Sequence, residues 1–294
     1  MGESMTTPAR YELSIGDSAY PDCLRDLPDP PRTLYVMGSP ASLVPGLGVI
    51  GARKATPYGL SGAQRFAGWA AAAGVTIVSG AAIGCDQAAQ LAARAGAGST
   101  VAVLGCGADV DYPSGSADLL CDLRKNCAVV SELPWGAPPV RWSFVRRNRI
   151  IAAFSAALLV VEAGLPSGTF STADFALDLG REVLAVPGAI THPESRGANR
   201  LIRQGATPIT DVSELGDALR QAGLEVGFTN ESERILLPSG SLERALLAEA
   251  QRPDDLARAL DCDVVTIARR LGELEMEGRV VRYRDGRYGF VASR

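Results

Sequence analysis

The sequence is poor in lysine and histidine. Of its 29 basic residues only Lys54 and Lys125 are lysines, and His192 is the single histidine. The six cysteines form no C-x-x-C pair, so neither cysteine nor histidine offers the ligand spacing of a zinc site. We therefore expect no metal and no other cofactor, and free thiols of the kind that persist in a reducing cytosol.

A membrane-spanning segment and a secretion signal are also missing. The longest apolar run, residues 150–161, is too short to cross a bilayer. Residues 1–10 are polar and lack the apolar core of a signal peptide. These absences predict a cytoplasmic protein without membrane association. The formal net charge of −4 argues against coating nucleic acid through bulk electrostatics, so any nucleic acid must meet a local basic patch.

A basic segment lies directly before that apolar run. Phe144 is followed by Arg146, Arg147, Asn148 and Arg149. Guanidinium groups present a planar fork of donors that matches phosphate oxygens and can also stack on bases. Taken alone, the segment is equally compatible with the solvated start of a helix. The glycine-rich turns described below favour the phosphate-binding interpretation.

Between residues 34 and 223, short β-rich runs alternate with helical stretches. The predicted strands cover residues 48–51, 75–79, 100–104, 128–131, 157–162 and 182–187, and the predicted helices residues 56–74, 85–95, 116–126, 150–155, 171–179 and 198–204. Near-continuous apolar strands between helices indicate a parallel sheet that is covered on both faces. The predicted fold class is therefore α/β, with a Rossmann-like, doubly wound and mostly parallel sheet over residues 36–223, after an N-terminal extension of residues 1–35.

The C-terminal part has a different pattern. Residues 224–240 lose the periodicity and are predicted to form a linker. Three helical patterns, 241–250, 253–260 and 264–277, then precede alternating residues around Asp285-Gly286, which predict a hairpin. Helices followed by a hairpin indicate a small winged-helix domain over residues 241–294, with 264–277 as its recognition helix.

Glycine-rich turns follow the predicted strands, at the edge where an open α/β sheet places its ligand site. Helix N-termini at such turns offer unpaired N–H groups and a positive dipole end to anions. The candidate residues in these turns are Arg53, Lys54, Ser79, Gly80, Gly84, Ser167, Gly168, Thr169 and Asn199. Asp86 is equally compatible with capping a helix and with contacting a ligand. Several such turns beside the basic segment predict an anion-binding cleft.

The motifs of common enzymes are absent. No G-x-x-x-x-G-K-[ST] motif occurs, which argues against a P-loop NTPase. Nothing around His192 resembles a nucleophile elbow, so no Ser–His–Asp triad is expected. Without a clear acid, base or metal, the sequence predicts a binding protein rather than an enzyme.

Ordered sequence blocks extend along most of the chain. They include Gly51-x-Arg53, Ser79-Gly80-x-Ala82-x-Gly84-x-Asp86, Val103-Leu104-Gly105-x-Gly107-x-Asp109-x-x-Tyr112-Pro113, Arg147-Asn148-Arg149-Ile150-Ile151, Ser167-Gly168-Thr169 and Ser195-Arg196-Gly197-x-Asn199. Together these blocks resemble the DNA-processing protein A family (DprA, also called Smf).

The resemblance implies an extended Rossmann fold that binds single-stranded DNA and delivers it to the recombinase RecA, chiefly during natural transformation. It further implies a homodimer without enzymatic activity in the usual sense. The residues that would line the DNA pocket by resemblance are Arg53, Ser79, Gly80, Phe144, Arg147, Asn148, Ser167 and Gly168. Phe144 would offer a stacking surface for a base. We expect Arg147→Ala to weaken binding of single strands and to leave the fold intact.

Three positions depart from the family pattern. Ile83 stands where the family often has an arginine, Gln90 replaces a histidine, and Val145 replaces the proline before the basic block. Because these positions lie at or near the expected pocket, the departures bear on binding strength more than on the fold.

Two other functions are compatible with the sequence. The lysine-decarboxylase-like group of nucleoside-monophosphate hydrolases shares this type of Rossmann domain, but it relies on a Pro-Gly-Gly-x-Gly-Thr turn and a nearby glutamate. Here the corresponding turn is Pro166-Ser167-Gly168-Thr169, and Asp174 is the nearest acid. Alternatively, the winged helix would bind duplex DNA as part of a transcription regulator, with the Rossmann domain sensing a nucleotide.

Overall fold

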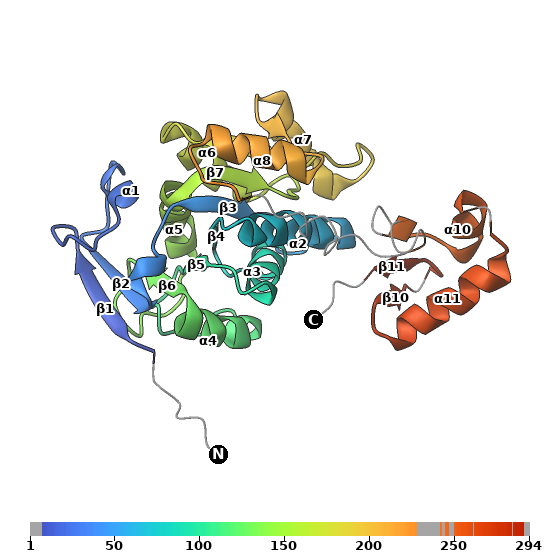
Figure 1. Cartoon of the computed structure of the whole chain (residues 1–294), viewed down its shortest axis with the longest axis horizontal. Helices are drawn as coiled ribbons and strands as arrows, with labels where there is room; N and C mark the ends of the chain where they lie inside the picture. The colour runs from blue at the N-terminus through green and yellow to red at the C-terminus, as the bar shows by residue number, and fades with distance from the viewer. Residues whose placement is uncertain are drawn as a thin grey trace, which may run out of the picture.

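The structure is a computed structural model that describes residues 8–227, 242, 245–246, 250–260, 262–283 and 285–290. A nine-stranded sheet with the order β1-β2-β6-β5-β4-β3-β7-β8-β9 forms its centre (Figure 1). The strands are β1 (Arg10–Ser14), β2 (Thr33–Gly38), β3 (Gly46–Ile50), β4 (Ile77–Ser79), β5 (Thr100–Val103), β6 (Ala128–Ser131), β7 (Ser155–Val160), β8 (Glu182–Ala185) and β9 (Thr207–Pro208). The run from β6 to β9 is parallel, which confirms the predicted Rossmann-like sheet.

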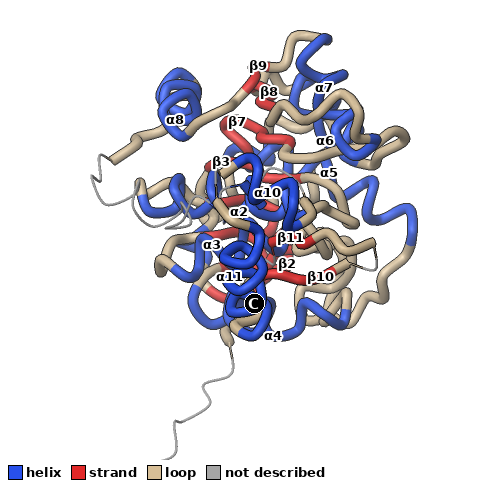
Figure 2. Tube along the Cα trace, turned by 90° about the vertical axis from the view of Figure 1, so that its right-hand side faces the viewer, coloured by secondary structure: helices blue, strands red, loops and turns tan. Residues whose placement is uncertain are grey.

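Helices cover both faces of this sheet, as Figure 2 shows. On one face lie α1 (Asp22–Arg25), α5 (Arg141–Phe154), α6 (Thr169–Asp178) and α7 (Arg196–Arg203). On the other face lie α2 (Pro57–Ala72), α3 (Cys85–Ala95), α4 (Ala117–Asn126) and α8 (Val212–Gln221). Successive strand residues alternate between the two cores because side chains in a strand point to opposite faces. None of the described helices is long and apolar enough to cross a membrane.

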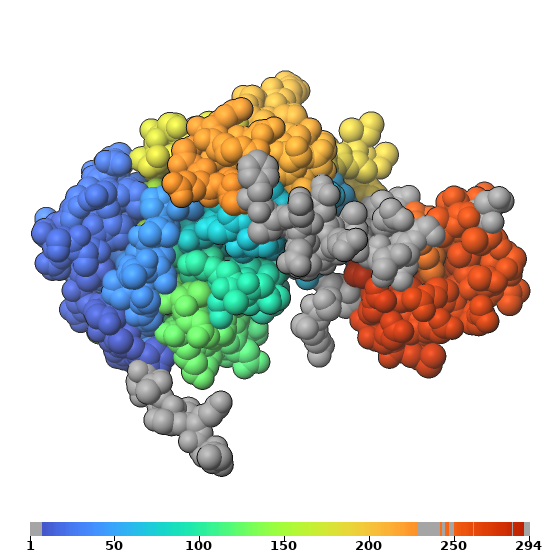
Figure 3. Space-filling model, in the orientation of Figure 1, coloured from blue at the N-terminus to red at the C-terminus, as the bar shows by residue number. Residues whose placement is uncertain are grey.

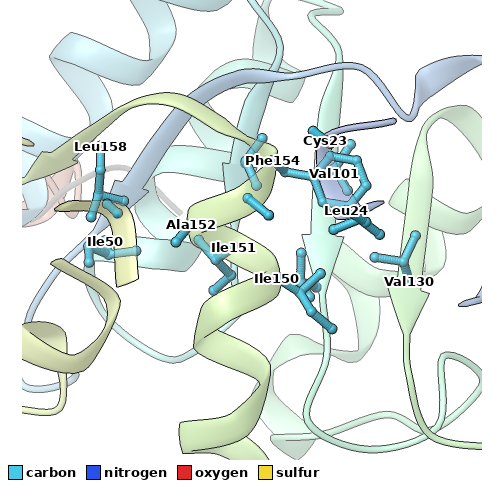
Figure 4. Close-up of a cluster of buried hydrophobic side chains, with 14 of the residues drawn as sticks. Cys23, Leu24, Ile50, Val101, Val130, Ile150, Ile151, Ala152, Phe154 and Leu158 are labelled. Carbon is cyan, nitrogen blue, oxygen red and sulfur yellow. The ribbon is translucent and has the colours of Figure 1, made fainter. Parts of the chain in front are cut away.

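Helix α5 connects the two halves of the sheet. Its second half carries Ile150, Ile151 and Phe154, which are fully buried among strand residues such as Val101 and Leu158 (Figure 4). The apolar run that begins at residue 150 therefore first ends a helix and then, from Ser155, forms the buried strand β7. The sequence predicted this division, and the structure confirms it.

Local signals explain most of the element boundaries. Thr56 caps α2, because its Oγ1 accepts from the Gly59 N–H at 3.2 Å while Pro57 occupies the first helical turn. The predicted helix 85–95 and strand 128–131 agree with the structure residue by residue. The antiparallel edge pair β1–β2 and the elements β9 and α8 were not predicted. Strand β1 buries only Leu13, so its apolar pattern is weak.

Two of the predicted domain limits can be compared with the positions of the helices and strands. The boundary at residue 35 falls inside β2, so the N-terminal extension supplies the edge of the same sheet. The predicted linker lies mostly outside the described residues, as does most of the helical pattern 241–250.

The C-terminal residues form the predicted winged-helix arrangement. It consists of α10 (Pro253–Ala259), α11 (Val264–Met276) and the antiparallel hairpin of β10 (Val280–Arg282) and β11 (Tyr288–Phe290). Leu256, Leu271 and Leu274 are fully buried in its own small core. Figure 3 shows these residues in red and orange-red, at the right of the blue-to-orange α/β domain.

Candidate functional site

The strand order creates a crevice at the carboxyl edge of the sheet. From β3 the chain proceeds outward to β4, β5 and β6, and α5 then returns it to β7 on the other side of β3. The loops after β3 and its neighbours therefore diverge, which is where open α/β sheets bind ligands. Two adjoining cavities lie at this edge.

The first cavity has a volume of about 340 Å³. The loop after β3, the N-terminal half of α5 and the loop after β7 form its walls. Its lining includes Arg53, Asp86, Phe144, Val145, Arg147, Asn148, Ser167, Gly168 and Thr169. Ser167 and Thr169 are joined by a hydrogen bond of 2.9 Å between their hydroxyl oxygens, and Asn148 Nδ2 donates to Ser171 Oγ at 2.9 Å. These contacts hold together the wall formed by α5 and the loop after β7.

The second cavity has a volume of about 270 Å³ and lies over the ends of β4 and β5. It is lined by Arg53, Lys54, Gly80, Ala82, Ile83, Leu104, Gly105, Cys106, Tyr112, Pro113, Phe144 and Arg147. Because Arg53, Ala82, Phe144 and Arg147 line both cavities, the two form one continuous site, which we call the cleft.

Phe144 provides an aromatic surface between the two cavities. Its ring centroid lies 5.4 Å from that of Tyr112. The guanidinium carbon of Arg53 lies 5.7 Å from the centroid of the Phe144 ring. Gly105 permits this position, since a Cβ there would come within 2.7 Å of the Phe144 ring. The cleft thus combines an aromatic face with an exposed cation, the pairing that binds stacked bases and their phosphates.

Arg147 forms the floor of the cleft. Its side chain is buried, and Nη1 donates to the main-chain oxygen of Gly80 at 3.0 Å and also to that of Val103. Burial lowers the pKa of Arg147 to about 10, and the nearby Asp86 carboxylate opposes this shift. Nε of Arg147 lacks a hydrogen-bond partner among the described residues. Arg147 therefore supports the loops on either side of it as well as facing the cleft.

The sequence left two roles open for Asp86, capping a helix or contacting a ligand, and its side chain does not cap α3. Its Oδ2 accepts from the main-chain N–H groups of Gly80 at 3.1 Å and Ala82 at 3.4 Å, while Gly84 occupies the N-cap position of α3. Burial raises the pKa of Asp86, and the Arg147 guanidinium opposes that rise. Asp86 thus holds the turn after β4 in shape and also lines the first cavity.

Arg146 and Arg149 point away from the cleft. Arg149 donates from Nη1 and Nη2 to the two carboxylate oxygens of Glu132 at 2.7 and 2.8 Å, and its side chain is only 7% exposed. Arg146 pairs with Glu132 at 3.0 Å and with Asp29 at 3.2 Å. The helical repeat of 3.6 residues explains the division, because it places neighbours in the basic segment on different sides of α5.

Three more predicted site residues support loops instead of lining the cleft. Ser79 is fully buried and donates from Oγ to the Val49 oxygen at 2.6 Å. Gly84 has a φ of 96°, and a Cβ there would collide with the Ala52 oxygen. Asn199 exchanges two hydrogen bonds with the main chain of Gly188. The predicted residues that do line the cleft are Arg53, Lys54, Gly80, Phe144, Arg147, Asn148, Ser167, Gly168 and Thr169.

A buried glutamate that the sequence interpretation missed anchors the loop that carries Arg53. Glu162, just beyond β7, accepts from the Thr56 N–H at 2.8 Å and from its hydroxyl at 2.6 Å. Burial raises the pKa of Glu162, and these two hydrogen bonds oppose the rise. Gly59 permits the contact, because a Cβ there would lie 2.5 Å from Glu162 Oε2. The sequence signal that could have identified Glu162 is an acidic residue directly after an apolar strand.

The described residues include no group of three or more His, Cys, Asp or Glu side chains placed to hold a metal ion. Asp174, the acid nearest to the turn 166–169 in sequence, is exposed on α6 and does not line either cavity.

Comparisons with known proteins assign both parts of the chain. The family model for DNA recombination-mediator protein A matches residues 12–220, and the model for the DprA winged helix domain matches residues 238–286. The chain is 35% identical to protein Smf of Escherichia coli over 289 residues, which cover 95% of this chain and 77% of that protein. It is 40% identical over 204 residues to a putative DNA processing protein DprA of Mycobacterium tuberculosis, which cover 69% of this chain and 50% of that protein.

Two solved structures are similar over most of the chain. The X-ray structure of DNA processing protein A from Streptococcus pneumoniae superposes with a TM-score of 0.67 at 33% identity, covering 76% of each chain. A structure of the Helicobacter pylori protein, reported for its single-stranded DNA binding mode, superposes with a TM-score of 0.66 at 29% identity, covering 72% of this chain and 96% of that one.

Proposed function

Since the chain belongs to the DNA recombination-mediator protein A family, we propose that it binds single-stranded DNA in the cleft and acts in the cytoplasm as a recombination mediator that protects incoming DNA and loads RecA onto it. The observation that carries the proposal is the position of the Phe144 ring between two cavities, with the exposed Arg53 beside it. Base stacking on an aromatic ring accepts any sequence, as a mediator requires. The single-stranded DNA binding reported for the Helicobacter pylori relative supports it.

The charge distribution favours a local site. The protein carries a formal net charge of −4, yet Arg53 and Lys54 are exposed at the rim of the cleft. Phosphates would meet these two cations and the main-chain N–H groups of the surrounding turns. Main-chain N–H groups bond to the carboxylates of both Asp86 and Glu162, which ties these two acids to the turns that they support. This arrangement favours binding over catalysis.

The test is fluorescence anisotropy of labelled single-stranded and double-stranded oligonucleotides across a salt series. We expect tighter binding of the single strand and a salt dependence that corresponds to several phosphate contacts, at about 0.7 per contact in the log–log slope. Equal affinity for both forms, or no binding of either, would overturn the proposal.

The family resemblance also supports a homodimer and a contact with RecA. Light scattering of the purified full chain should give twice the monomer mass of 30.7 kDa. A RecA filament-assembly assay on DNA coated with single-strand-binding protein should show faster assembly when the chain is added. A monomer, or an unchanged assembly rate, would contradict the respective part of the proposal.

A further inference from the structure

A tryptophan outside the cleft has no assigned role. Trp142 lies in the first turn of α5 and is 57% exposed. No other tryptophan or phenylalanine in the described part of the chain is among the exposed large apolar side chains. Keeping an indole ring in water forfeits the free energy of burying a large apolar surface, and an exposed ring that adjoins other apolar side chains is a candidate contact surface.

The neighbours of Trp142 connect it to the cleft. Val145 follows one helical turn later, is 55% exposed and lines the first cavity. Residues three or four apart on a helix have Cβ atoms about 5–6 Å from each other. Trp142 and Val145 therefore form a continuous apolar surface that begins at the mouth of the first cavity and continues over the outside of α5.

A cation completes this surface. Arg146 follows Trp142 by four residues, and its side chain is 46% exposed although it pairs with Glu132 and Asp29. Asp29 is itself 73% exposed, so that pair is in contact with water and is weakly held. A phosphate can replace Asp29 at the guanidinium while Glu132 continues to orient it. We call Trp142, Val145 and Arg146 the outer ledge.

We propose that the outer ledge binds the segment of single-stranded DNA that leaves the first cavity, with one base stacked on Trp142 and its phosphate at Arg146. The inference rests on the proposed function of the cleft and extends it beyond the two cavities. Single-stranded nucleic acid is favoured as the occupant because the ledge is continuous with the cleft and pairs an aromatic ring with a guanidinium. A strand presents both matching groups at every nucleotide.

The test compares Trp142→Ala, Trp142→Phe and the wild type on oligothymidylates of about four and about twelve nucleotides, lengths within the range of known single-strand site sizes. Leu91→Ala is the matched control, since Leu91 is 49% exposed on α3 and does not line the cleft. We expect Trp142→Ala to weaken binding of the longer strand by at least about five-fold, with little effect on the shorter one. Trp142→Phe should retain most of the affinity because it keeps a stacking ring.

Each outcome decides the matter. A Trp142→Ala protein that binds both lengths as the wild type does would overturn the inference and direct attention to a protein partner for the ledge. An equal loss for both lengths would also overturn it, because that result indicates a structural effect on the cleft. If the wild type bound neither length, the proposed function itself would fail, and the ledge with it.

Discussion

On the outer side of helix α5, Arg149 holds both carboxylate oxygens of Glu132 and is almost inaccessible to solvent. On the inner side Arg147 is as deeply buried, yet it bonds to main-chain oxygens at the floor of the cleft. Arg53 comes from another loop and remains exposed at the cleft rim. Three arginines at one edge of the sheet thus have three different surroundings.

The difference shows that a basic run in a sequence is not a basic patch on a surface. A buried guanidinium needs internal partners, because an uncompensated buried charge costs several kcal/mol. Arg147 and Arg149 find such partners in the protein, and their charge is then less available to a ligand. In the proposed cleft, the charge available to phosphate is that of the exposed Arg53 and Lys54, which lie outside the basic run.

The largest expected effect is on stability at the outer side. Arg149→Ala leaves the buried Glu132 carboxylate with only the half-exposed Arg146 as an ion-pair partner, and it should lower the free energy of unfolding by about 3 kcal/mol or more. Urea denaturation measures this loss. Arg146→Ala is the control, because Arg146 is 46% exposed and Glu132 keeps both hydrogen bonds from Arg149, so the loss should be no more than about 1 kcal/mol. A loss below about 1 kcal/mol in Arg149→Ala would mean that the pair is not buried in solution.

Arg147→Ala should affect both stability and binding. It removes the hydrogen bonds to Gly80 and Val103 and the charge that opposes the pKa rise of Asp86, at a cost of about 3 kcal/mol. The structure therefore revises the expectation that this substitution leaves the fold intact. Anisotropy at low temperature, where the variant is still folded, should show weaker binding of single strands. If Arg149→Ala weakens binding of single strands as much as Arg147→Ala does, the distinction between the inner and the outer side of α5 is wrong.

Arg53→Ala should separate binding from stability. The exposed side chain contributes little to folding, so the unfolding free energy should change by less than about 0.5 kcal/mol. Affinity for single strands should fall by roughly ten-fold at low salt, and the salt slope should become shallower by about 0.7. Arg203→Ala, an exposed arginine on α7 that does not line the cleft, is the matched control. Similar affinities for the two variants would remove Arg53 from the site.

Ile83→Arg should act in the opposite direction. Ile83 is 53% exposed and lines the second cavity, so an arginine there would add one phosphate contact. We expect a few-fold gain in affinity and a slope steeper by about 0.7 in the same salt series. Ile83→Met, which adds length without charge, should bind as the wild type does. If the methionine variant shows the same gain, apolar contact rather than charge is responsible.

The smallest effect concerns pH. Burial raises the pKa of Glu162 in the folded state above its usual 4.5. Between the unfolded-state pKa and the folded-state pKa, the folded protein therefore binds more protons than the unfolded chain. The stability contributed by Glu162 is therefore full below the unfolded pKa and is lost as the pH rises through the folded pKa. Glu162→Gln lacks this titration. Its melting temperature relative to the wild type should rise as the pH is raised above 4.5, whereas a constant difference would show an unshifted carboxyl group.

Much of the fold follows from signals that act over a few residues. Thr56 and Pro57 mark the start of α2, and the apolar runs of β5, β6 and β7 indicate strands buried on both faces. The edge strand β1 was missed because its position depends on pairing with β2 rather than on its own pattern. The two cavities lie at the edge of the sheet where the anion-binding cleft was predicted, since the carboxyl ends of parallel strands converge there.

The sequence by itself determined most of the elements, their order and the chemical groups in the turns, because hydrophobic periodicity, helix capping and glycine geometry are local. Only the tertiary structure decided which groups face the cleft. Arg146 meets Asp29 across 117 positions, and Thr56 meets Glu162 across 106. Such partners are chosen by packing between distant segments, so identical side chains in one basic run become a loop support, a buried ion pair or a surface cation.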